Sequence, residues 1–150
     1  MNSLQHAFRT DDLIFAIHQD ASRFSAFIKG FLSAALFTTE DETLFTCLDW
    51  RDCDEEAHEI AHSVAQIMYN FISVYDIKFP NQNSHFQFGL DTFMSARRTG
   101  VNFDDRGHYQ HISIELKNFV QSRLAKIQNA ETWYDEDDEK FHIRIHQRDF

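Results

Sequence analysis

The spacing of apolar residues predicts helices in three long segments of the chain. Apolar residues recur at three- and four-residue steps from residue 20 to residue 37, after a short predicted helix at residues 12–19. The same spacing returns at residues 55–74 and again at residues 109–129. Since each segment also contains regularly spaced polar positions, each should place one face on a core and the other in water.

The middle helix carries the clearest signals for its limits. Asp52 and Glu55 stand three residues apart, as in a capping box with Asp in place of Ser or Thr. The helix should end before Pro80, because a proline restricts the residue that precedes it to extended backbone. Its predicted core face consists of Ala57, Ile60, Ala61, Val64, Ile67, Met68, Phe71 and Tyr75.

Alternation of apolar and polar residues predicts two β-hairpins. The first joins residues 85–96 to residues 101–107 through a turn containing Gly100, and Gly89 would mark a bulge or a close approach of two backbones. The second covers residues 132–146, with an acidic turn in its middle. The predicted fold class is therefore α+β: an antiparallel sheet of about four strands from two hairpins, packed against three to four helices.

Composition favours one domain that spans residues 1–150. Apolar residues make up 43% of the chain, while Gly (4) and Pro (1) are too rare for a flexible linker. The most apolar segment, residues 24–37, contains Lys29 and is shorter than the roughly 20 residues that cross a bilayer. Two cysteines without a disulfide or zinc pattern, and no secretory signal, favour the cytoplasm. No cofactor is expected.

The formal net charge of −10 is concentrated in two acidic runs. Such runs repel nucleic acid phosphates, so direct nucleic acid binding is not expected, whereas a basic protein surface would be attracted. The simplest interpretation of either run alone is a solvated face that keeps a Phe-rich protein in solution. The predicted partner-binding residues are Glu40, Asp41, Glu42, Asp52, Asp54, Glu55, Glu56, Asp135, Glu136, Asp137, Asp138 and Glu139.

Residues 58–62, HEIAH, match the pattern that places two zinc-binding histidines on one helix face. In that chemistry His58 and His62 would bind zinc, and Glu59 would act as base on a metal-bound water. However, both histidines lie on the opposite side of the helix from the predicted core face, and no third ligand is evident. A surface face with two histidines is the preferred interpretation, and a zinc hydrolase stays open as an alternative.

Other groups of polar residues give weaker signals. Arg97, Arg98 and Arg106 surround the first predicted hairpin and form a candidate anion or ligand site, although a surface ion-pair network is the simpler interpretation. His142 lies near a strand end and His108 at a helix start, where exposed histidines are the default expectation. No Gly-rich phosphate loop and no evident catalytic triad are present in the sequence.

Residues 87–107, QFGLDTFMSARRTGVNFDDRG, resemble a block found in small phage- and plasmid-encoded proteins, with the form Q-x-G-H-D-F-W-L-T-R-N-G-H-G-x-G-F-W-D-R-G. Residues 31–42 are similar to a second segment of that family, and the likeness extends over residues 31–145. Leu90 replaces the family's His, Ala96 its Arg, and Arg97 and Arg98 its Asn-Gly. The matching residues are Gln87, Gly89, Asp91, Gly100, Phe103, Asp105, Arg106 and Gly107.

The resemblance implies a mobile-element origin but no residue-level function. Together with the charge, it leads to the hypothesis of a non-enzymatic inhibitor of a host defence system, of the anti-CRISPR or anti-restriction type, in the bacterial cytoplasm. Its partner would be a host protein with a basic, nucleic-acid-binding surface. The alternatives are the zinc hydrolase, a small-ligand or nucleotide-binding module at the arginines, and a homo-oligomer joined through residues 12–37.

Overall fold

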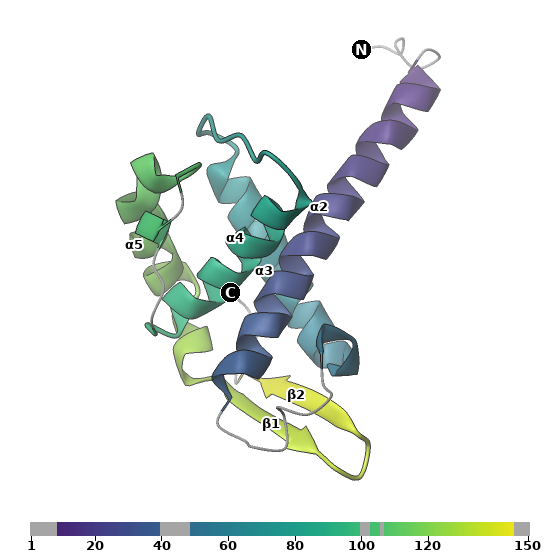
Figure 1. The fold of residues 1–150 in the computed structure, drawn as a ribbon, viewed down its shortest axis with the longest axis vertical. Coiled ribbons are helices and arrows are strands. Elements are labelled where there is room, and N and C mark those ends of the chain that lie inside the picture. The colour runs from purple at the N-terminus through teal and green to yellow at the C-terminus, as the bar shows by residue number, and fades with distance from the viewer. Residues whose placement is uncertain (1–8, 40–48, 100–102, 106, 146–150) are drawn as a thin grey trace.

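The computed structural model describes residues 9–39, 49–99, 103–105 and 107–145. Four α-helices and one hairpin make up most of this part of the chain, and short 3-10 helices connect them (Figure 1). The helices are α2 (Arg9–Thr38), α3 (Glu55–Ile72), α4 (Gln82–Ala96) and α5 (Ser113–Arg123), and the strands are β1 (Glu131–Asp135) and β2 (Lys140–Arg144).

The predicted helices are confirmed, with changed limits. Residues 12–19 and 20–37 belong to one continuous helix, α2. Helix α3 begins one residue after Asp54, whose side chain accepts a hydrogen bond from the Ala57 backbone at 2.8 Å. The predicted capping box at Asp52 is therefore wrong: Asp52 instead closes a capping box with Asp49 around the 3-10 helix Trp50–Asp52.

The first predicted hairpin is wrong, because its first strand is the helix α4. The side chain of Asn81 caps this helix by accepting a hydrogen bond from the backbone of Ser84 at 3.0 Å. Residues 103–105 form a 3-10 helix in place of the second strand. The buried positions of α4 follow the helical period, although its alternating Phe and Leu residues suggest a strand: Ser84, Phe88, Gly89, Asp91, Thr92, Phe93, Ser95 and Ala96 are buried.

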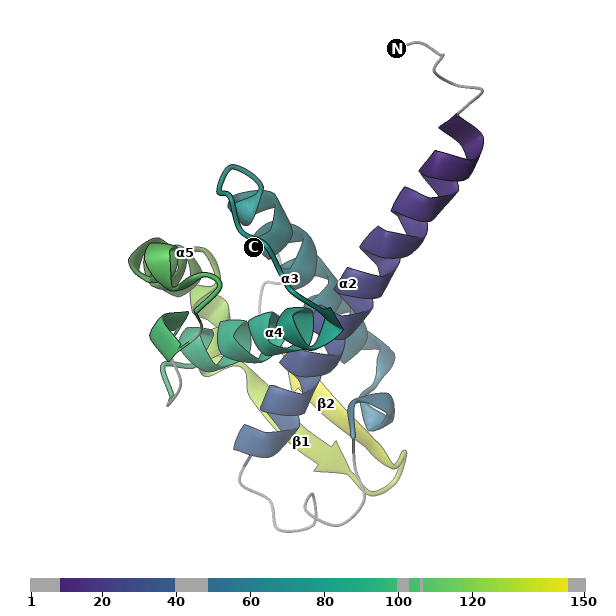
Figure 2. The ribbon, with the colours of Figure 1, turned by 45° about the horizontal axis from the view of Figure 1, so that its top comes forward.

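Helix α4 crosses α2, as Figure 2 shows, and the two backbones come very close at two glycines. A Cβ atom built on Gly89 would overlap the carbonyl oxygen of Phe27 in α2, and a Cβ on Gly30 would overlap that of Phe86 in α4. The two glycines thus allow the helix backbones to touch. The close backbone approach predicted at Gly89 is confirmed, but it occurs between helices and not in a sheet.

The second predicted hairpin is confirmed. Strands β1 and β2 pair antiparallel, with Trp133 opposite His142 and Tyr134 opposite Phe141. Phe141 and Ile143 point into the core. The backbone of Phe141 also accepts a hydrogen bond from Asp54 at 3.0 Å, which holds the hairpin against the start of α3. In the described residues the sheet has two strands, so the α+β class holds without the four strands that were expected.

Aromatic rings fill the core between α2, α3 and α4. Phe31 and Phe93 meet edge to face at a centroid distance of 5.1 Å, and Phe27 meets Phe88 in the same way at 5.4 Å. Such contacts add to the free energy gained by burying the rings. Of the helices that the structure describes, none combines the length and the apolar character needed to cross a membrane.

Candidate functional site

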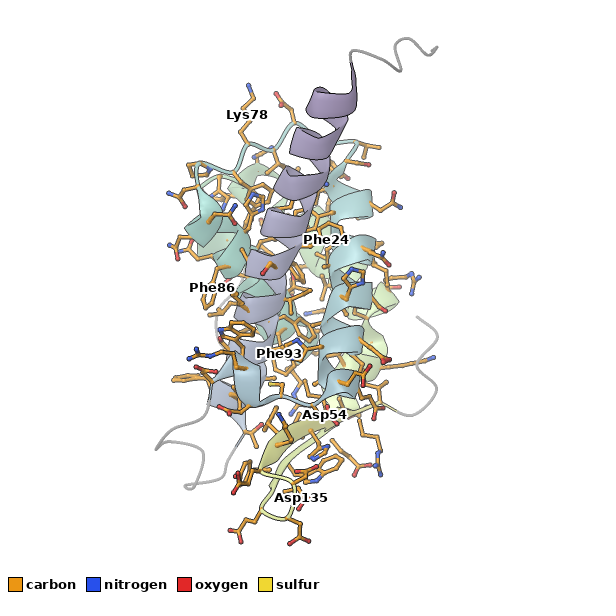
Figure 3. The ribbon with its side chains drawn as sticks, turned by 90° about the vertical axis from the view of Figure 1, so that its right-hand side faces the viewer. Phe24, Asp54, Lys78, Phe86, Phe93 and Asp135 are labelled. Atoms are coloured by element: carbon orange, nitrogen blue, oxygen red, sulfur yellow. The ribbon has the colours of Figure 1, made fainter. Side chains whose placement is uncertain are left out.

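The two acidic runs meet at one end of the molecule. Figure 3 places Asp54 and Asp135 at the same end, opposite Lys78. The contact between Asp54 and the backbone of Phe141 produces this arrangement, because it joins the start of α3 to the hairpin. We call the described residues of this surface the acidic end: Asp52, Asp54, Glu55, Glu56, Asp135, Glu136, Asp137, Asp138 and Glu139.

Some carboxylates of the acidic end are used by the local fold. Asp54 caps α3, and Asp135 accepts a hydrogen bond from the backbone of Asp137 at 2.9 Å. Asp138 accepts from the backbone of Lys140 at 2.9 Å and so shapes the hairpin turn. These bonds fix the turn that carries Glu136 and Glu139, whose side chains are exposed.

His142 connects the two acidic runs. Its Nδ1 lies 2.8 Å from Asp54 Oδ2, and its Nε2 lies 2.8 Å from Asp138 Oδ2. The imidazole is stacked on Trp133, with ring centroids 5.0 Å apart and an angle of 11° between the planes. Although the sequence suggested an ordinary exposed histidine, its side chain is only 17% exposed. Its position opposite Trp133 in the hairpin was the signal that could have identified it.

The crowding of carboxylates is visible in the pKa values of neighbouring groups. Burial raises the pKa of Tyr134, and the negative charges of Glu139, Glu136, Asp52 and Asp138 raise it further. Residues of both acidic runs therefore act on the same phenol. The surface combines acidic groups from two distant parts of the sequence in one electrostatic environment.

Cys53, beneath this surface, is not a reactive nucleophile at neutral pH. Burial raises the pKa of its thiol to about 12, and the nearby carboxylates of Asp54, Asp52 and Asp49 contribute to the increase. Since the thiolate is the reactive form, the folded protein keeps this group inert. Asp49 itself is paired with Arg51, whose guanidinium lowers the pKa of that carboxyl.

The HEIAH residues lie on α3, near its start. The His58 ring meets Trp50 edge to face at 6.2 Å, and the exposed His62 ring meets Phe24 in the same way at 5.7 Å. Within the part of the chain that the structure describes, the one group of three side chains spaced to hold a metal ion is Asp135, Asp138 and His142. His58, Glu59 and His62 are not in that group.

The candidate anion site at the arginines is only partly described. Arg97 donates to the carbonyl oxygens of Ala130 at 2.7 Å and Ile127 at 3.3 Å, so its guanidinium joins the end of α4 to the segment before β1. Burial lowers its pKa. Arg98 is exposed and has a positive φ of 58°. Arg106, like the predicted binding residues Glu40, Asp41 and Glu42, lies outside the described residues.

Two residues of the block at residues 87–107 contribute to the fold. Gly89 forms the helix crossing, and the fully buried Asp91 accepts a hydrogen bond from the Tyr109 hydroxyl. Both positions are explained by packing and by the need to pair a buried carboxylate.

No protein-family model matches the chain, no curated protein matches its sequence, and no solved structure matches it. What the protein does is therefore inferred from the arrangement and chemistry of the described side chains. Among these, the acidic end is the surface on which charge, exposure and a rigid support occur together.

Proposed function

We propose that the protein is a non-enzymatic inhibitor from a phage or mobile element, which binds a basic surface of a host defence protein through the acidic end. The observation that carries the proposal is the meeting of two acidic runs, distant in sequence, on one rigid surface. A nucleic-acid-binding groove presents Lys and Arg side chains, and a fixed set of carboxylates is complementary to it.

The shape of the acidic end supports this function. The β1–β2 turn projects beyond the helices in Figure 1, and Glu136, Asp137 and Glu139 on it are exposed. The described contacts give these three side chains no ion-pair partner. A projecting turn can enter a concave basic groove, whereas nucleic acid itself would be repelled by the same charges. The predicted location, the cytoplasm of a bacterial host, follows from this role.

The zinc hydrolase and the arginine ligand site receive less support. His58 and His62 are packed beside aromatic rings on α3, without a third described ligand, and Arg97 is occupied by carbonyl oxygens of the chain itself. Binding through the acidic end uses exposed side chains on a turn whose backbone is held by the hydrogen bonds of Asp135 and Asp138.

The test is affinity capture from phage-infected or plasmid-bearing bacteria, followed by binding measurements with the captured protein. The acidic-end variant Glu136→Gln, Asp137→Asn, Glu139→Gln is compared with a matched control, Asp76→Asn, Asp104→Asn, Glu115→Gln, which removes the same charge from exposed positions elsewhere. We expect the acidic-end variant to bind at least about tenfold more weakly and the control to bind like the wild type.

Salt and nucleic acid provide two further readouts. Affinity should fall as ionic strength rises, because exposed charge pairs are screened within about 10 Å at 0.1 M salt. Nucleic acid should compete for the captured protein. Equal loss of affinity in both triple variants would mean that only net charge matters, and binding that resists both salt and nucleic acid would contradict the proposal.

A further inference from the structure

One corner of the acidic end has the ligand set of a metal ion. Asp135, Asp138 and His142 each offer one ligand atom, and these three atoms lie within 4.8 Å of one another. They come from both strands of the hairpin and from its turn. Two carboxylates and an imidazole are a ligand set for divalent transition metal ions, which accept mixed nitrogen and oxygen ligands.

The orientation of His142 is the second observation. Its Nδ1 lies 2.8 Å from Asp54, a residue at the start of α3 that is not among the three ligands. A hydrogen bond from Nδ1–H to this carboxylate leaves the lone pair on Nε2, which faces Asp138. Histidines that bind metal ions commonly donate their other N–H to a carboxylate in this way. The stacked Trp133 ring restricts rotation of the imidazole.

Nε2 and Asp138 Oδ2 lie 2.8 Å apart, a distance at which the two atoms share a hydrogen bond. Two atoms bound to one ion at about 2.1 Å lie about 3.0 Å apart in octahedral geometry and about 3.4 Å apart in tetrahedral geometry. A small separation of the two side chains would therefore let a divalent ion replace the shared proton, close to the carboxylates of Asp54, Asp135 and Asp138.

We propose that Asp135, Asp138 and His142 bind one divalent transition metal ion, with water molecules at the remaining coordination positions. Asp54 is a positioning residue, since it fixes the imidazole without contacting the ion. The proposal does not depend on the function of the acidic end. Bound metal would connect β1, the turn and β2 and would therefore stabilise the hairpin against the start of α3.

The experiment titrates the metal-free full-length protein with MnCl₂ by calorimetry, with ZnCl₂ and MgCl₂ measured alongside. We expect one equivalent of Mn²⁺ to bind, and Mg²⁺ to bind at least about tenfold more weakly, because imidazole favours transition metals. Asp138→Asn and His142→Gln should each weaken Mn²⁺ binding by about tenfold or more. The Asn amide oxygen can still accept the bond from Lys140, so the turn should remain folded.

Two matched controls distinguish binding at these three side chains from binding elsewhere in the protein. Asp137→Asn removes the same charge from the same turn but lies outside the ligand group, and it should keep the wild-type affinity. His62→Gln removes a histidine of the HEIAH motif and should also have no effect. A readout independent of the variants is paramagnetic broadening by Mn²⁺, which should remove the indole N–H resonance of Trp133 from the NMR spectrum before that of Trp50.

The proposal is overturned if the wild type binds no Mn²⁺ or Zn²⁺ up to about 1 mM, an affinity of about 4 kcal/mol. Such a result would leave His142 as a hydrogen-bond partner of Asp54 and Asp138 alone. Equal losses in Asp137→Asn and Asp138→Asn would show diffuse attraction of cations to the turn. Loss of binding in His62→Gln would assign the metal to the HEIAH motif.

Discussion

At the scale of single residues, His85 lies where a positive charge is unfavourable. Its Nδ1 is 2.7 Å from the Tyr69 hydroxyl, and its ring stacks on Phe79 with centroids 4.3 Å apart. Burial, together with the positive charge of Arg23 and the neighbouring His108, lowers the pKa of His85 to about 4. His85 is consequently neutral in the folded protein at pH 7, and its Nδ1 can accept a hydrogen bond from the Tyr69 hydroxyl.

This pKa difference predicts a loss of stability in mild acid. In the unfolded chain His85 takes up a proton near pH 6.5, whereas in the folded protein it does so only near pH 4. Between these values the unfolded state binds more protons, so the free energy of unfolding falls as the pH is lowered. Because the side chain is half exposed, we expect a loss of about 1 kcal/mol.

Urea unfolding at pH 7, 6, 5 and 4 measures the effect. His85→Gln removes the titrating group and retains an acceptor for Tyr69, so its stability should change less over this range than that of the wild type. The exposed His111→Gln serves as the control and should follow the wild type. If His85→Gln and His111→Gln lose stability in parallel, His85 is not the source of the acid sensitivity.

At the residue scale, prediction from the sequence succeeded in part at Gly89. This glycine was expected to mark a bulge or a close backbone approach within a strand, and the α2–α4 crossing confirms a close approach, but between helices. The prediction failed for His142: its place opposite Trp133 follows from the register of the hairpin, but its contact with Asp54 follows only from the packing of the hairpin on α3.

At the scale of elements, the crossing of α2 and α4 predicts that replacing Gly89 by Ala lowers the free energy of unfolding much more than replacing Gly107. In the interior of a helix, Gly→Ala normally stabilises by about 1 kcal/mol. At Gly89 the added Cβ would overlap the backbone of Phe27 and separate the helices, so Gly89→Ala should lower the free energy of unfolding by about 3 kcal/mol. Denaturant unfolding monitored by circular dichroism measures the change.

Gly107→Ala is the matched control, because a Cβ at Gly107 meets no atom within 4 Å. Its effect should stay within about 0.5 kcal/mol. A Gly89→Ala protein as stable as the wild type would show that the two helices are not in backbone contact. Equal destabilisation by both substitutions would point to a general effect of replacing glycine and not to the crossing.

Local sequence patterns predicted the C-terminal hairpin correctly and helix α4 wrongly, and the difference has a physical reason. The hairpin predicted at residues 132–146 is confirmed, with strands at residues 131–135 and 140–144, because alternation, an acidic turn and strand pairing are all local. Helix α4 was misassigned because Phe86, Phe88 and Leu90 alternate, while the burial that determines the helix includes Ser84, Asp91 and Thr92. A helix buried on most of its surface loses the simple apolar and polar faces on which the prediction depends.

At the scale of the whole molecule, the acidic end exists because tertiary contacts bring two distant segments of the chain together. The sequence showed two acidic runs, and their meeting depends on the hydrogen bond from Asp54 to Phe141 and on the bridging His142. These contacts join segments that no local pattern relates. The two acidic runs could therefore be recognised in the sequence, whereas the single surface that they form could be recognised only in the folded structure.

The backbone conformation at Glu139, in the turn of the hairpin, indicates that this acidic residue lowers the stability of the protein. Glu139 has a positive φ of 57°, a conformation that favours Gly or Asn over residues with longer side chains. Glu139→Asn should therefore raise the free energy of unfolding by about 1 kcal/mol, since it relieves the backbone strain and removes one repelling carboxylate. Thermal unfolding in the absence of any partner gives the comparison.

Glu139→Gln separates the two contributions, because it removes the charge and leaves the strained backbone. We expect it to stabilise by only a few tenths of a kcal/mol, in line with the small energies of exposed charges. In partner binding the two variants should be weakened equally, since both lose the same carboxylate. If Glu139→Asn is no more stable than Glu139→Gln, the strain is absent, and if neither variant weakens binding, Glu139 does not face the partner.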